Sequence, residues 1–320
     1  MSPLVLGTLV LSLMLVSLWL SGALFLDEAA GFWMTPIQAT GEVLTVSMAT
    51  SFLIGASRYA KRETHVTLDK LIESGTLSLA SVTPLRMKVS SLNLSQQITA
   101  TIVGAALGWL NVPWSVLWSD LGQPAMLPSI GIAMGNVTVW MVASHIIVRR
   151  YFNSIALRNL GRQHAEVDLL RLDSLLPFGR IGTLDFAILI ITMSLSAFQS
   201  IDAELRWDSY RNAFVIGLPV AFSLLLLPML GIRQNVRATK QRALEKLNAA
   251  IAAADRELGA SSLHYLNNLL QQREVIERAR EWPLDTTAFS RVAIYVVIPP
   301  LAWIGSALAE ILLETAMAGG

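Results

Sequence analysis

Long apolar stretches alternate with charged segments along the whole chain, and seven of these stretches are long enough to cross a membrane as helices. A helical span needs about 20 mostly apolar residues, and a helix satisfies its own backbone hydrogen bonds inside a bilayer. The seven stretches cover residues 3–26, 36–57, 97–118, 126–148, 181–201, 212–232 and 289–313. The pattern therefore predicts an all-α, polytopic membrane protein with seven transmembrane helices, arranged as three helical hairpins and one final span.

Lys and Arg residues are confined almost entirely to three long connections, and this asymmetry predicts the orientation of the chain. The segments 58–95, 149–180 and 233–291 hold 6, 6 and 10 of the 24 bases. Cytoplasmic segments of membrane proteins carry an excess of Lys and Arg. We therefore expect these segments and the N-terminus to lie in the cytoplasm and the C-terminus outside, with the chain in a bacterial-type cytoplasmic (inner) membrane.

The composition agrees with a membrane protein. Hydrophobic residues make up 53% of the 320 residues and charged residues only 15%, against roughly 25% in soluble domains. The absence of cysteine excludes disulfides, thiolate metal sites and a cysteine nucleophile. The segment Ser21-Gly-Ala23 loosely matches a signal-peptidase site, but no base precedes it and its apolar run is too long. A retained first span is therefore favoured over a cleaved signal peptide.

The predicted organisation has three parts. Residues 1–232 hold the first six spans with the cytoplasmic loops 58–95 and 149–180, residues 233–284 form a cytoplasmic helical hairpin, and residues 285–320 hold the seventh span and a short outer tail. The hairpin is predicted from a heptad-like, coiled-coil-like seam, a glycine-containing break at 259–262 and a second helix over about 263–282. The seam consists of Leu244, Leu247, Ile251, Ala254 and Leu258. Two interpretations of this hairpin are equally favoured. It associates with another subunit or a partner protein, or it is a helical extension that packs only within the chain.

The chain shows no residue pattern of a soluble enzyme. Its four histidines are nowhere three or four residues apart, which argues against a His-x-x-x-His zinc site. No phosphate-binding glycine loop and no Gly-x-Ser-x-Gly nucleophile motif is present. We therefore expect no enzymatic activity, no cofactor and no metal, and a nucleic-acid partner is not expected either.

Glu42 is the clearest polar residue inside an apolar stretch. It lies about six residues into the second span, which places it roughly 9 Å from the outer end at 1.5 Å per residue. Gln38 and Thr45 share its helical face. Because acidic residues inside membranes are costly and usually functional, Glu42 is interpreted as a cation or proton site, and the alternative is a structural carboxylate bonded to a neighbouring helix.

The fifth span carries a second polar face, formed by Asp185, Thr192, Ser196 and Gln199 at helical spacing. Asp185 is only about one turn from the inner end of the span, so we expect it to reach the lipid headgroups or to meet Arg180. His145 lies similarly near the inner end of the fourth span and is expected at the interface.

Asn136 lies near the middle of the fourth span. We expect it to form a hydrogen bond to another helix, with pore lining as the alternative.

Small residues and prolines add information about packing and about helix breaks. Gly104 and Gly108, and likewise Gly131 and Gly135, form small-xxx-small motifs, which allow close helix contact, for instance between the third and fourth spans. Two prolines, Pro219 and Pro228, are expected to interrupt the sixth span, and Pro299-Pro300 is expected to kink or unwind the seventh.

These observations favour an integral membrane transport protein, channel-like or carrier-like, that moves a small cation or a proton across the cytoplasmic membrane. The expected ion site or path residues are Glu42, Gln38, Thr45, Asn136, Asp185, Thr192, Gln199, Pro299 and Pro300. The alternative is a non-transporting membrane scaffold or signalling protein that acts through the cytoplasmic hairpin. The expected partners are the lipid bilayer, further copies of the chain in a homo-oligomer, and a cytoplasmic protein bound at residues 233–284.

Overall fold

The computed structural model describes residues 2–20, 36–89, 92–112, 114–119, 122, 126–200, 207–254, 260–282, 290–298, 301 and 305. All regular secondary structure in these residues is helical, as predicted, and residues 290–298 are also helical. The elements, in chain order, are α1 (Pro3–Leu20), α2 (Pro36–Glu73), α3 (Leu79–Val89), α4 (Leu94–Leu110), α5 (Trp114–Ser119), α6 (Met126–Gln163), the 3-10 turn η2 (Leu172–Leu175), α7 (Leu176–Ser194), the 3-10 turn η3 (Leu195–Ser200), α8 (Trp207–Ala254) and α9 (Ala260–Arg278).

Five of these helical segments are long and apolar enough to cross a membrane. They are α1, most of α2, α6, the continuous segment from η2 to η3, and most of α8. The predicted third stretch is not one helix, because α4 ends at Leu110 and α5 begins at Trp114. Pro113 lies within this break in the sequence, and a proline disfavours the helical conformation of the residue before it. The seventh stretch, including Pro299-Pro300, lies largely outside the described residues. The five helices are compatible with a membrane-embedded protein.

The basic connections are helices and not loops. α2 continues unbroken to Glu73 and α6 to Gln163, so the loops expected over 58–95 and 149–180 are wrong for most of their length. Pro84 lies inside α3. Likewise α8 remains one helix through Pro219 and Pro228 and extends to Ala254. The sixth apolar stretch and the first arm of the predicted hairpin are therefore one helix of 48 residues, about 72 Å long.

These helical extensions fold because their apolar residues face a common core. The core joins the C-terminal parts of α2 and α6 and the middle of α8 to α3 and the beginning of α7. Its fully buried members include Leu68 and Leu71 of α2, Leu157 of α6, Phe178 of α7 and Ile232 of α8. Tertiary burial of one helical face is what stabilises most protein helices. The charged end of the molecule is therefore a packed helical bundle.

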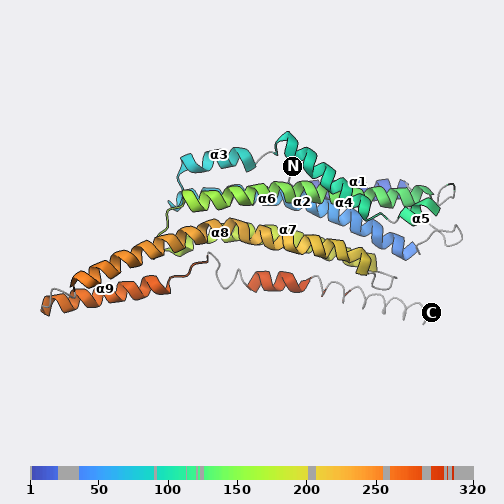
Figure 1. Ribbon diagram of the computed structural model, residues 1–320. Helices are drawn as coiled ribbons and strands as arrows, with labels where there is room; N and C mark the ends of the chain where they lie inside the picture. The colour runs from blue at the N-terminus through green and yellow to red at the C-terminus, as the bar shows by residue number, and fades with distance from the viewer. Residues whose placement is uncertain are drawn as a thin grey trace.

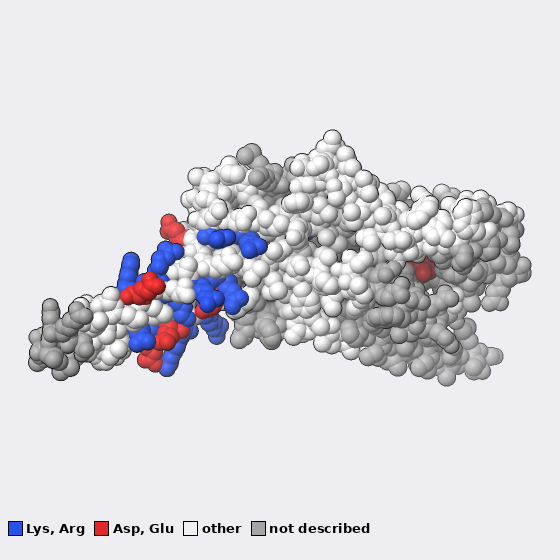
Figure 2. Space-filling model, in the orientation of Figure 1, with Lys and Arg blue, Asp and Glu red and all other residues white. Residues whose placement is uncertain are grey.

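The helices run side by side along one long axis, and the α8–α9 hairpin extends beyond the others at one end (Figure 1). Lys240 of α8 donates hydrogen bonds to the carbonyl oxygens of Glu277 and Ala279, at 2.7 and 3.1 Å, which shows that α9 runs antiparallel to α8. On the face shown in Figure 2, most charged side chains gather towards the end that carries the α8–α9 hairpin. The rest of the described surface of that face is almost uncharged.

α1 lies antiparallel along α2. Ser51 of α2 donates its hydroxyl to the Gly7 carbonyl oxygen, and near the other end of α1 Leu18 packs with Ala39 and Val43. The first residues of α1 therefore lie next to Gly55, just before the charged part of α2 begins.

Glycines set the closest approach between α4 and α6. A Cβ on Gly104 would lie 2.6 Å from the Met141 Cα, and one on Gly108 would lie 2.6 Å from the Val137 Cα. Gly135 of the second small-residue motif instead faces Val46 of α2. The two motifs thus serve different helix contacts.

Replacing Gly104 by Ala is expected to lower the free energy of unfolding by about 1–3 kcal/mol, because the added methyl group would overlap the α6 backbone. Gly7→Ala is the matched control, since its nearest neighbour would be the Ser51 carbonyl oxygen at an ordinary 3.5 Å. Unfolding of the purified proteins in detergent, followed by circular dichroism, measures both. Equal losses from the two substitutions would contradict the close α4–α6 contact.

Candidate functional site

Glu42 lies where α2 contacts η3. Its Oε2 accepts a hydrogen bond from the Gln199 Nε2 at 2.8 Å, and Thr45 donates its hydroxyl to the Leu195 carbonyl oxygen at 3.3 Å. Gly41 allows this approach, because a Cβ there would overlap the Phe198 carbonyl oxygen. The structure thus brings together three residues that the sequence singled out, from positions more than 150 residues apart. Gln38 is half-buried one turn earlier on α2.

A buried ion pair joins α6 to α7. The Arg150 Nε lies 2.9 Å from the Asp185 Oδ1, and the two side chains are only 5% and 2% exposed. Arg150 also donates from Nη1 to the Thr64 hydroxyl of α2 at 3.3 Å. The expectation that Asp185 reaches the headgroups or meets Arg180 is wrong, because Arg180 pairs with Glu63 at 3.2 Å instead.

Arg150 was missed as a site residue, although the sequence contains a signal for it. On a continuous helix it shares one face with Ile146 and Leu157, both buried, at spacings of four and seven residues. Its neighbour Arg149 points about 100° away and donates a hydrogen bond to the Ser57 hydroxyl. Extending the helical periodicity of the fourth span past its apolar part would have placed Arg150 inside.

The polar face of α7 does not form a continuous network across helices. Thr192 and Ser196 donate their hydroxyls to carbonyl oxygens of their own segment, at 2.7 and 2.6 Å. Asn136 is half-buried on α6, and Pro299 and Pro300 lie outside the described residues.

The two polar contacts, Glu42 with Gln199 and Arg150 with Asp185, are therefore separate sites. They are 14 residues apart along α7 and η3, roughly 21 Å.

Buried hydroxyl groups add to the polar character of α2. In the described part of the chain, the hydroxyls of Ser47 and Thr50 are buried without a hydrogen-bond partner. A buried polar group without a partner costs free energy. The buried face of α2 therefore carries polar groups that do not stabilise the fold.

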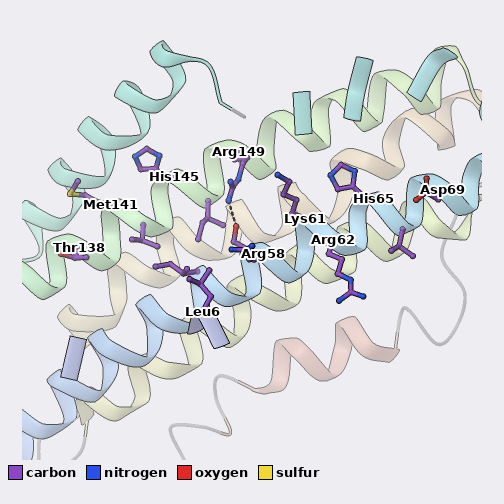
Figure 3. Close-up of a pocket in the computed structure, with 15 residues that line it drawn as sticks. Leu6, Arg58, Lys61, Arg62, His65, Asp69, Thr138, Met141, His145 and Arg149 are labelled. Atoms are coloured by element: carbon purple, nitrogen blue, oxygen red, sulfur yellow. Dashed lines mark hydrogen bonds between the residues drawn. The ribbon is translucent and has the colours of Figure 1, made fainter. Parts of the chain in front are cut away.

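A basic cavity of about 1000 Å³ opens between α1, α2 and α6. The bases in its lining are Arg58, Lys61 and Arg62 of α2 and Arg149 of α6. Figure 3 shows Lys61 and Arg149 extending into the space between α2 and α6. This cavity was not predicted, because the helices that line it are far apart in the sequence.

His145 also lines this cavity, and its Nε2 lies 2.9 Å from the Thr101 hydroxyl of α4. Within the described residues, no group of three or more His, Asp and Glu side chains could hold a metal ion. These polar groups can accept, donate or exchange protons and can bind simple ions. No known protein family, characterised protein or solved structure matches this chain.

Proposed function

We propose that this protein is an integral membrane transport protein that moves a proton or a small cation across the membrane. The observation that supports the proposal is the Arg150–Asp185 ion pair, buried among apolar helices. A charged side chain at membrane depth costs at least about 2.5–3.5 kcal/mol, and such residues usually mark ion or proton pathways. Because a buried pair is often no more stabilising than apolar side chains of the same size, stability alone does not account for it.

In the proposed arrangement the chain crosses the membrane seven times, with the N-terminus and the charged helical end in the cytoplasm. The beginning of α1 lies beside Gly55, next to the first bases of α2, which supports an N-terminus on the charged side. The Arg150–Asp185 pair then lies towards the cytoplasmic face and Glu42 towards the outer face. The two carboxylates are the ion or proton sites, and exchange of the Arg150 contact for an incoming cation opens the inner site.

Liposome flux measurements test this function. The full-length protein, reconstituted with a pH-sensitive dye or a cation indicator inside, is expected to dissipate an imposed proton, sodium or potassium gradient. Glu42→Gln is expected to reduce the flux to the level of empty liposomes, because the neutral amide has no negative charge to attract a cation and no proton to release. Glu245→Gln, at an exposed site on α8, is the matched control and should keep the wild-type rate.

Two results would contradict the proposal. One is the absence of flux above empty liposomes for every gradient, and the other is an unchanged rate in Glu42→Gln. The first result would favour the membrane scaffold as the alternative, whereas the second would exclude Glu42 as an ion or proton site.

Among the described residues, no specific contact favours the scaffold function. α8 and α9 lie against each other, and Ala254 of the seam on α8 and Leu269 of α9 are buried. Subunit association and a cytoplasmic partner at residues 233–284 remain predictions.

A further inference from the structure

We propose that the basic cavity between α1, α2 and α6 binds the phosphate headgroup of an anionic membrane phospholipid, with the acyl chains lying along its apolar wall. This site is separate from the proposed ion sites, because neither Glu42 nor Asp185 lines the cavity. The inference does not depend on transport, only on the membrane location.

The cavity lining changes from apolar to basic along its length. Leu6 of α1, Ile54 of α2 and Met141 of α6 form the part nearer the centre of the bundle. One to two turns further towards the charged end, α2 contributes Arg58 and Lys61. A phospholipid has this same polarity, with a negative phosphate next to long hydrocarbon chains. The order of the lining therefore fits a lipid better than a free anion.

The described part of the protein does not neutralise the bases of the cavity by ion pairs. Among the described residues, no carboxylate lies within ion-pair distance of Arg58, Lys61 or Arg62. Asp69 is the one acid in the lining, and it pairs with Arg86 of α3. The nearby bases therefore repel one another, and an anion bound between them would relieve that repulsion.

The position of the cavity suits a headgroup. It lies where the apolar part of α2 gives way to the charged extension, which is the level of the lipid phosphates if the apolar part is in the membrane. The adjoining α1 is apolar and mostly exposed, with Leu9 and Leu13 more than half exposed. Basic pockets between helices on the cytoplasmic side are known to bind anionic headgroups. A lipid can therefore enter from the bilayer along α1.

Native mass spectrometry of the full-length protein in mild detergent tests the proposal, with phosphatidylglycerol as the anionic probe and phosphatidylcholine as the zwitterionic probe. Phosphatidylglycerol is expected to bind more tightly. Because each base near a membrane surface contributes about fivefold in affinity, Arg58→Gln/Lys61→Gln is expected to weaken phosphatidylglycerol binding about 30-fold. Phosphatidylcholine binding should change little.

Arg242→Gln/Lys246→Gln is the matched control, since it removes one Arg and one Lys at exposed positions on α8. It should leave phosphatidylglycerol binding unchanged. Arg58→Gln alone provides a second variant at an exposed position, with an expected loss of about fivefold. A third arm adds inorganic phosphate, which is expected not to displace the lipid.

Three results would overturn the proposal. They are equal binding of the two lipids, equal losses in the two double variants, and displacement of the lipid by millimolar inorganic phosphate. The last result would identify a soluble phosphate as the ligand in place of a lipid. None of these results depends on ion flux, so the lipid site and the transport function can fail separately.

Discussion

Asp185→Ala is expected to lower the free energy of unfolding by about 3–5 kcal/mol, because it leaves the Arg150 guanidinium buried without its carboxylate. The loss reflects an unpaired buried charge and not the net strength of the ion pair. Unfolding of the purified protein in detergent, followed by circular dichroism, measures it.

Glu63→Ala is the matched control for this substitution. It also removes an acid that pairs with an arginine between α2 and α7, but Glu63 is 20% exposed and Arg180 58% exposed. Such a partly exposed pair contributes about 1 kcal/mol or less. Equal effects of Asp185→Ala and Glu63→Ala would show that Arg150 is not buried with Asp185.

The double substitution Arg150→Met/Asp185→Leu separates stability from function. Replacing both charges by apolar side chains of similar size is expected to restore most of the lost stability, as for other buried ion pairs. If the pair has the proposed role in transport, this stable variant should still lack ion flux in liposomes. A stable double variant with wild-type flux would assign the pair to folding alone.

Phe178→Ala is expected to destabilise the protein by about 3–5 kcal/mol, because its ring is fully buried in the core at the charged end. The same detergent unfolding measurement applies. This effect would be unexpected if the basic segments were solvated loops, so it tests the packed bundle directly.

Phe152→Ala is the control for this prediction. Phe152 lies in the extended part of α6 but is 43% exposed, so its replacement should change the free energy of unfolding by about 0.5 kcal/mol or less. Similar losses at the two positions would contradict the core described for α2, α3, α6, α7 and α8.

Whether a site residue or its contact could be predicted depends on how far along the chain the relevant residues lie. Glu42, Thr45 and Gln199 could be singled out because a polar residue within an apolar stretch is visible in the sequence alone. Their mutual contact could not be predicted, since Glu42 and Gln199 lie 157 residues apart. Asp185 could also be singled out from the sequence, but the predicted partner Arg180 was wrong. Arg180 is nearer along the chain, whereas Arg150 is nearer in space.

The amino-acid sequence is sufficient to predict that the protein is helical, to locate its long apolar stretches and to show where the bases gather. These properties depend on composition and on helical periodicity, which act over a few turns. Three further features required the three-dimensional structure: the packing of the basic segments as helices around a common core, the pairing of Asp185 with Arg150, and the basic cavity between α1, α2 and α6. Those features arise from contacts between helices distant in sequence, where burial and charge pairing in space outweigh proximity along the chain.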